Sequence, residues 1–128
     1  MRRIFPNLPV RDAQAARAFW SELGFGFNEM FSDDRTACLV VEENISVMLL
    51  SEPRFTDFVT GPVADAHAAT GVLLCLSASS RAEVDVLADK AIAAGGKPHL
   101  PPMEHGPMYG RSFTDLDGHV WELMSMEG

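Results

Sequence analysis

The sequence is poor in cysteine, in basic residues and in long apolar runs. Two cysteines in 128 residues exclude a disulfide scaffold of the kind found in small secreted domains. Ten Lys and Arg against 18 Asp and Glu give a formal net charge of -8, which repels phosphate backbones and anionic lipid headgroups. No run approaches the roughly 20 apolar residues that cross a bilayer, and the N-terminus lacks the apolar segment of a signal peptide. We expect no nucleic-acid partner, no membrane association and a cytoplasmic location.

What the sequence does contain is typical of a folded core. Hydrophobic residues make up 47% of the chain and charged residues 22%, as in ordinary globular proteins. A chain of 128 residues is long enough for one compact domain and too short for several. Cys38 and Cys75 lie within apolar runs, which predicts small buried thiols.

The first half of the chain predicts a strand, a helix and three further strands. Asp12 has the position of an N-cap, and apolar residues then recur at helical spacing until Gly24. Polar clusters separate the later apolar runs, as in hairpins. The expected strands cover residues 4–10, 25–31, 36–41 and 45–50.

The second half predicts the same order of elements. Ser80 and Glu83 have the spacing of a capping box at the start of a helix, and Gly95 follows its last turn. Asp117-Gly118 is a strong hairpin signal before the final strand. The expected strands cover residues 72–76, 97–100, 110–114 and 119–126.

The repetition itself is the main clue to the fold. We expect a single domain of two βαβββ modules, residues 1–52 and 71–128, joined by a connection at residues 53–70. This connection forms a lid, covers a sheet edge or meets a partner chain. Each module alone leaves one face of its sheet bare. The sequence therefore predicts an α+β fold in which a curled, incompletely closed mixed sheet surrounds a central cavity.

Two motifs resemble those of the vicinal oxygen chelate superfamily, which includes glyoxalase I, bleomycin resistance proteins and extradiol dioxygenases. They are the helix end Phe19-Trp20-Ser21-Glu22-Leu23-Gly24-Phe25 and the terminal Asp115-Leu116-Asp117-Gly118-His119-Val120-Trp121-Glu122-Leu123. The second departs from the usual pattern, which has Pro at the position of Leu116. The resemblance implies the glyoxalase fold, and it implies a homodimer.

The resemblance also implies four metal-ligand positions, one on the first strand and one on the last strand of each module. We place Phe5, Met48, Leu73 and Glu122 at these positions. Three of the four cannot bind a divalent ion well, and one carboxylate cannot hold catalytic zinc, nickel or iron. We therefore predict no cofactor, and expect a divalent metal only if the ligand alignment is different. His99 and His105 do not have the spacing of a replacement site.

Alternation along the strands selects the residues that face the cavity. Glu122 is the candidate catalytic residue: with apolar neighbours its carboxylate would act as a general base or as a hydrogen-bond anchor, and the alternative is a purely structural bond. Glycines at both ends of residues 106–110 suggest a loop that grips the ligand. The candidate substrate-binding residues are Phe5, Asn7, Met48, Leu73 and Cys75 in the cavity and Tyr109 and Arg111 at its mouth.

Three hypotheses for function follow. The first is a metal-independent protein that binds a small amphipathic organic molecule, similar to the family's resistance proteins. The second is an enzyme, similar to lactoylglutathione lyase or the ring-cleavage dioxygenases, that uses atypical ligands or Glu122 as a base. The third is a structural or regulatory partner protein, which a cavity filled by side chains would favour.

Overall fold

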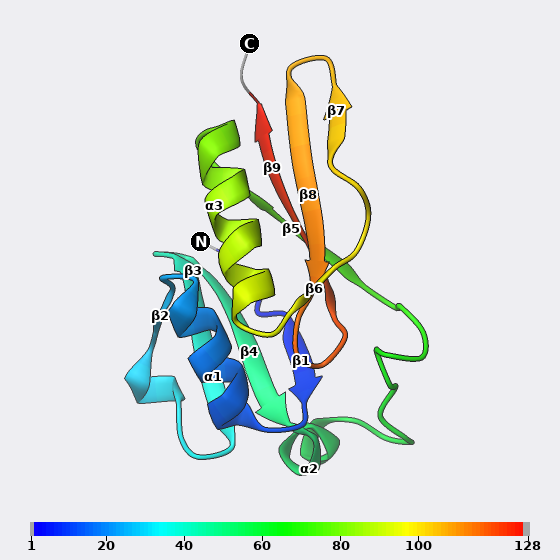
Figure 1. Ribbon diagram of the computed structural model, residues 1–128. Helices are drawn as coiled ribbons and strands as arrows, with labels where there is room; N and C mark the ends of the chain where they lie inside the picture. Colours follow the sequence, from blue (N-terminus) through cyan, green and yellow to red (C-terminus); the bar gives the residue numbers. More distant parts are fainter. Residues whose placement is uncertain (1, 127–128) are drawn as a thin grey trace. The chain divides into compact units, whose positions relative to one another are not determined.

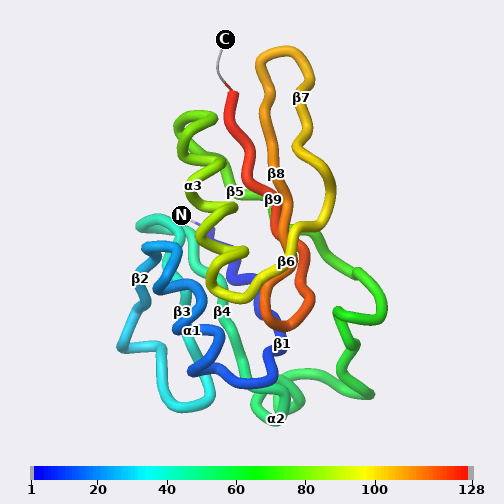
Figure 2. The backbone as a smooth tube through the Cα atoms, in the orientation of Figure 1, coloured from blue at the N-terminus to red at the C-terminus, as the bar shows by residue number. Residues whose placement is uncertain are grey.

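The computed structural model describes residues 2–126 and shows an α+β fold with mixed sheets that are not closed. The chain divides into two compact units, Met1–Ala64 and Asp65–Gly128, called here the first and second halves. The boundary falls within the predicted connection. Each half contains one sheet and one long helix, which Figures 1 and 2 show in colours that follow the sequence.

The first half has a four-stranded sheet in the order β1-β4-β3-β2. Strand β1 pairs parallel with β4, and the other pairs are antiparallel. The elements are β1 (Asn7–Val10), α1 (Ala13–Glu22), β2 (Gly26–Phe27), η1 (Glu29–Phe31), β3 (Thr36–Glu42), β4 (Ile45–Ser51), α2 (Glu52–Phe55) and η2 (Thr56–Phe58).

The second half repeats this arrangement. Its sheet has the order β5-β9-β8-β6, with β7 paired to β8, and β5 pairs parallel with β9. The elements are β5 (Leu73–Ser77), α3 (Arg81–Ala93), β6 (Lys97–Pro98), β7 (Met103–His105), β8 (Met108–Thr114) and β9 (Val120–Met126).

Both long helices begin and end as the sequence predicts. The carboxylate of Asp12 accepts hydrogen bonds from the backbone N–H groups of Gln14 and Ala15, at 2.9 and 3.3 Å. The hydroxyl of Ser80 accepts from the N–H of Glu83 at 3.1 Å. These side chains satisfy N–H groups that lack a partner within the helix. Gly24, with φ +96°, follows the end of α1 in the left-handed conformation that glycine adopts easily.

Each helix packs on one face of its own sheet and leaves the other face open. In the first half, Leu8 and Val10 of β1 and Leu49 of β4 are buried on the helix side, and so are Phe19 and Trp20 of α1. The alternate residues of the same strands face away from the helix. This open face, bare of any helix in its own half, is where the sheet can present side chains to a ligand.

The turn between β8 and β9 explains the terminal motif. Asp115 is 7% exposed, and its carboxylate accepts from the N–H groups of Asp117 and His119 and from the indole N–H of Trp121. Gly118 has φ +83°, and a Cβ there would lie 2.8 Å from the backbone nitrogen of His67. The motif therefore builds a buried polar turn that only glycine can close.

Four sequence predictions need correction. The strand expected over residues 4–10 begins at Asn7, and the strand expected over 25–31 is reduced to two residues. Residues 29–31 instead form η1, because the Asn28 side chain accepts from the N–H of Met30. In the second half the strand expected over 97–100 covers Lys97–Pro98. The predicted loop around residues 106–110 is the tight turn and first part of a hairpin, in which Glu104 pairs with Tyr109.

No helix within residues 2–126 is long and apolar enough to span a membrane.

Candidate functional site

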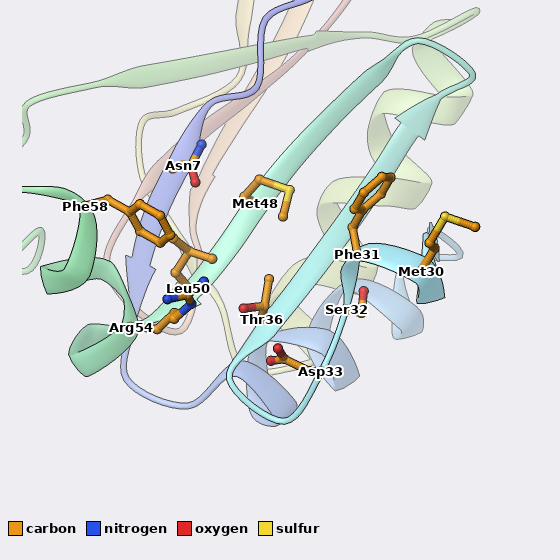
Figure 3. A pocket seen from close by; sticks show the side chains of 10 residues that line it. All are labelled: Asn7, Met30, Phe31, Ser32, Asp33, Thr36, Met48, Leu50, Arg54 and Phe58. Carbon is orange, nitrogen blue, oxygen red and sulfur yellow. The ribbon is translucent and has the colours of Figure 1, made fainter.

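A pocket of about 250 Å³ lies on the open face of the first sheet (Figure 3). Its floor consists of side chains from three neighbouring strands, because Asn7 is opposite Met48 and Leu50 is opposite Thr36 in the strand register. Alternation sends all four side chains to the face away from α1. The floor therefore combines a thioether, an isobutyl group, an amide and a hydroxyl.

One wall of the pocket comes from the segment after β2. Met30 and Phe31 of η1 line it, followed by Ser32 and Asp33. Ser32 fixes this segment to β3, since its hydroxyl donates to the carbonyl of Asn28 at 2.7 Å and accepts from the N–H of Cys38 at 3.0 Å. The wall is thus held by local hydrogen bonds while its two large apolar side chains remain exposed.

The opposite wall comes from the short helices after β4. Arg54 of α2 and Phe58 of η2 line it. The Arg54 guanidinium lies 4.6 Å from the centre of the Phe58 ring and donates to the carboxylate of Asp57 at 2.9 Å. Arg54 brings a positive charge to this wall, and Asp33 brings a negative charge to the other.

Asn7 and Met48, both predicted as ligand-binding residues, line this pocket. Phe5 does not: it precedes β1, is 45% exposed, and has the Arg3 guanidinium 5.2 Å from its ring centre. The main-chain carbonyl of Phe5 accepts from the Asn7 side-chain amide at 2.7 Å. This bond uses one of the two N–H groups of the Asn7 amide, so the second N–H and the side-chain oxygen can contact a ligand.

In the strand register Asn7 lies opposite Met48, and Phe5 precedes β1. In the second half Cys75 lies opposite Glu122, and Leu73, which is 53% exposed, lies opposite Val120. Asn7 and Cys75 are therefore the strand neighbours of Met48 and Glu122.

In the second half, Cys75 and Glu122 are neighbours on the open face of the sheet. Cys75 is exposed, whereas Cys38 is buried, so the prediction of two buried thiols is wrong for Cys75. Partial desolvation of its sulfur and a hydrogen bond to the Glu122 carboxylate raise the pKa of the Cys75 thiol to about 11. The thiol is therefore protonated at neutral pH and donates to Glu122.

Replacing Glu122 with glutamine is expected to make Cys75 more reactive. Removal of the carboxylate lowers the pKa of the thiol from about 11 toward its ordinary value of 9.0. Each unit of decrease gives about tenfold more thiolate at pH 8, and the thiolate is the nucleophile. We expect iodoacetamide to modify Cys75 several-fold faster at pH 8 in Glu122→Gln than in the unaltered protein. A Cys75→Ser variant measures the contribution of Cys38, and an unchanged pH midpoint in Glu122→Gln would contradict the assigned contact.

Tyr109 and Arg111 point toward α3 and not toward an open face. The Tyr109 hydroxyl donates to the Asp85 carboxylate at 2.6 Å, and this bond lowers the pKa of the Asp85 carboxyl. Desolvation raises this pKa, and the hydrogen bond and charge of Arg111 lower it further. Arg111 pairs with Asp85 at 3.2 Å and Asp89 at 3.0 Å. The predicted ligand-gripping loop is thus a strand whose polar side chains attach it to the helix.

Several residues that line the pocket are not among those predicted from the sequence. Arg54 and Phe58 lie in the connection at residues 53–70, for which the sequence predicts a lid or an edge cover without indicating which side chains face a ligand. Met30 and Phe31 were assigned to a strand. The Asn-Glu-Met-Phe-Ser sequence that caps and fixes η1 is a signal that could have placed them.

Solved structures of other proteins share this fold. The chain is similar to the hypothetical protein SA1046 from S. aureus, with 25% identity, a TM-score of 0.83, and coverage of 98% of this chain and 94% of that one. A glyoxalase-related enzyme from Fulvimarina pelagi has 20% identity and a TM-score of 0.82, over 98% and 88% of the chains. A lactoylglutathione lyase from Agrobacterium tumefaciens has 16% identity and a TM-score of 0.70, over 97% and 92%.

No curated protein matches the chain. A family model described as glyoxalase/bleomycin resistance protein/dioxygenase superfamily matches residues 4–123. This match covers both modules and confirms the resemblance that the two sequence motifs indicate. The chain therefore belongs to the glyoxalase/bleomycin resistance protein/dioxygenase superfamily.

Proposed function

We propose that this protein binds a small amphipathic organic molecule in the pocket of the first half. The observation that carries the proposal is the composition of the lining: apolar Met48, Leu50 and Phe58 stand beside Asn7 and Arg54 in one concave site. Five of the ten lining residues are apolar and five are polar or charged, which suits a ligand with both apolar and polar parts. The volume of about 250 Å³ lies just below the range of about 300–1,000 Å³ common for larger ligands, which favours a small one.

We further propose that binding does not depend on a metal ion. The residues that the resemblance places at the family's ligand positions do not fit one: Phe5 and Leu73 carry no donor atom, Met48 offers only a thioether, and Glu122 is a single carboxylate. Within residues 2–126, no group of three or more His, Cys, Asp or Glu side chains is placed to hold an ion. His99 and His105 are exposed, which also supports the proposal.

A metal-free reaction with Glu122 as general base is the second candidate function. The placement of Glu122 on the open face of the second sheet, beside the Cys75 thiol, favours it. Turnover of a hemithioacetal or a catechol that disappears in Glu122→Gln would support this candidate over binding alone.

We also propose that the protein forms a homodimer. Strands β1 and β5 are the edges of their sheets, each paired on one side among the described residues. Exposed edges and open sheet faces favour association with another chain. We expect light scattering to give the molar mass of two chains of 14.0 kDa each.

Replacing Met48 with tryptophan is expected to abolish ligand binding by filling the pocket. The side chain lies on the open face, so the larger indole extends into the pocket and not into the core. A fragment library screened by ligand-observed NMR is expected to give hits with the unaltered protein that are lost with Met48→Trp. Circular dichroism checks that the variant is folded.

Met103→Trp is the matched control, because Met103 is also a strand methionine but lies in the second half, where it is 47% exposed. The control is expected to keep all hits. Hits that survive in Met48→Trp at unchanged affinity would show that the ligand binds elsewhere.

A further inference from the structure

We infer that the ligand of this pocket is a flat aromatic molecule that carries an anionic group, with the ring between Phe31 and Phe58 and the anion at Arg54. The inference rests on the proposed function and specifies the ligand class. It is carried by the two walls of the pocket, which present exposed aromatic rings on opposite sides and a cation on one of them.

The two phenylalanines are exposed although their surroundings are ordered. Phe31 is 60% exposed and Phe58 is 62% exposed, yet both flank one concave site (Figure 3). They come from different segments, Phe31 from η1 next to β3 and Phe58 from η2 after β4. An aromatic ring bound on the floor between these walls (Figure 3) can make stacked or edge-to-face contacts with the exposed phenylalanine rings, and such contacts are favourable. This geometry favours an aromatic ligand over a branched aliphatic one.

Arg54 can hold an anion in addition to its present partner. A guanidinium has five N–H donors, and the described contacts use Nη1 for the carboxylate of Asp57. The side chain is about one-third exposed, so the remaining donors are accessible from the pocket. The Phe58 ring under the guanidinium holds it flat, which suits the two parallel hydrogen bonds that a carboxylate accepts.

Asp33 sets the direction in which such a ligand lies. It lines the wall opposite Arg54, and its carboxylate accepts from the N–H of Arg35 at 2.8 Å. An anionic group near Asp33 would be repelled, whereas at Arg54 it is attracted. Asp33 and the hydroxyl of Thr36 are suitable partners for hydrogen-bond donors on the other end of the ring.

The test compares an aromatic acid with its neutral amide. Indole-3-acetate and indole-3-acetamide have nearly the same shape and differ in charge, and calorimetry at 0.15 M salt measures both affinities. Long-range repulsion by the acidic chain is largely screened beyond about 8 Å at this salt concentration. We expect the acetate to bind at least tenfold more tightly than the amide.

A variant at Arg54 and a variant at its partner Asp57 are expected to change the acetate affinity in opposite directions. Arg54→Gln removes the cation, so the preference for the acetate falls to within twofold of the amide. Asp57→Asn frees Nη1 of Arg54 and removes a competing carboxylate, so the acetate binds several-fold more tightly while the amide is unchanged. Arg35→Gln is the matched control, because Arg35 is an exposed arginine of the same half outside the pocket lining, and it leaves both affinities unchanged.

The outcomes separate this inference from the proposed function. Equal binding of the two probes, or a preference that persists in Arg54→Gln, would overturn the anionic ligand class and leave the pocket as a binding site. If neither probe binds, the inference is overturned as well, and the fragment screen with Met48→Trp decides separately whether the pocket binds ligands.

Discussion

Replacing Asp115 with alanine is expected to lower the free energy of unfolding by about 3 kcal/mol, because it leaves buried N–H groups without an acceptor. The carboxylate accepts from Asp117 at 2.9 Å, from His119 at 3.0 Å and from the Trp121 indole at 2.9 Å. The indole of Trp121 is fully buried, so water cannot replace the lost acceptor. Urea denaturation followed by circular dichroism measures the change.

Asp34→Ala is the control for this substitution. Asp34 is an exposed aspartate in a turn of the first half, and its removal is expected to change stability by no more than about 0.5 kcal/mol. Equal effects of the two substitutions would show that Asp115 does not hold the β8–β9 turn together.

Replacing Trp20 with alanine is expected to cost about 3–5 kcal/mol of stability, the range for a large aromatic side chain removed from a core. Trp20 is 1% exposed, and its ring packs edge-on against Phe19 and Phe25 at centroid distances of 5.4 and 5.5 Å. Truncation leaves a cavity between α1 and the first sheet. The same denaturation experiment measures the loss.

The contrast with Phe31 separates core aromatics from ligand-contacting ones. Phe31→Ala removes a side chain that is 60% exposed, so stability is expected to change by about 0.5 kcal/mol or less while binding weakens. A large loss of stability in Phe31→Ala together with a small loss in Trp20→Ala would contradict the assignment of Trp20 to the core and of Phe31 to the ligand site.

The repeated helices were predictable because their signals are local. Asp12 and Ser80 cap the N-termini, and Gly24 and Gly95 follow the ends in left-handed conformations, as sequence spacing indicates. The terminal motif was recognised by resemblance, but its physical role was not. That Asp115 accepts three hydrogen bonds depends on the path of the turn, which short-range patterns do not specify.

The candidate site was predictable in part, because alternation along the strands indicates the floor of the pocket, whereas the walls depend on tertiary packing. Alternation along the first strand predicts that Asn7 faces the cavity, the family resemblance places Met48 there, and both line the pocket. Phe5 does not line it, because the strand begins only at Asn7. The walls come from short helices, whose few residues carry no periodic signal.

The methionine methyl groups allow the most direct test of the claim that the first half holds the ligand site. Met30 and Met48 line the pocket, whereas Met103, Met108 and Met124 lie in the second half. Methyl NMR of ¹³C-methionine-labelled protein, titrated with a fragment hit or indole-3-acetate, reports contact at each position. The account predicts that the Met30 and Met48 resonances shift with ligand and show intermolecular NOEs to it, while those of Met103 and Met124 do not. Shifts and NOEs at Met124, beside Glu122, with Met30 and Met48 unchanged, would contradict it.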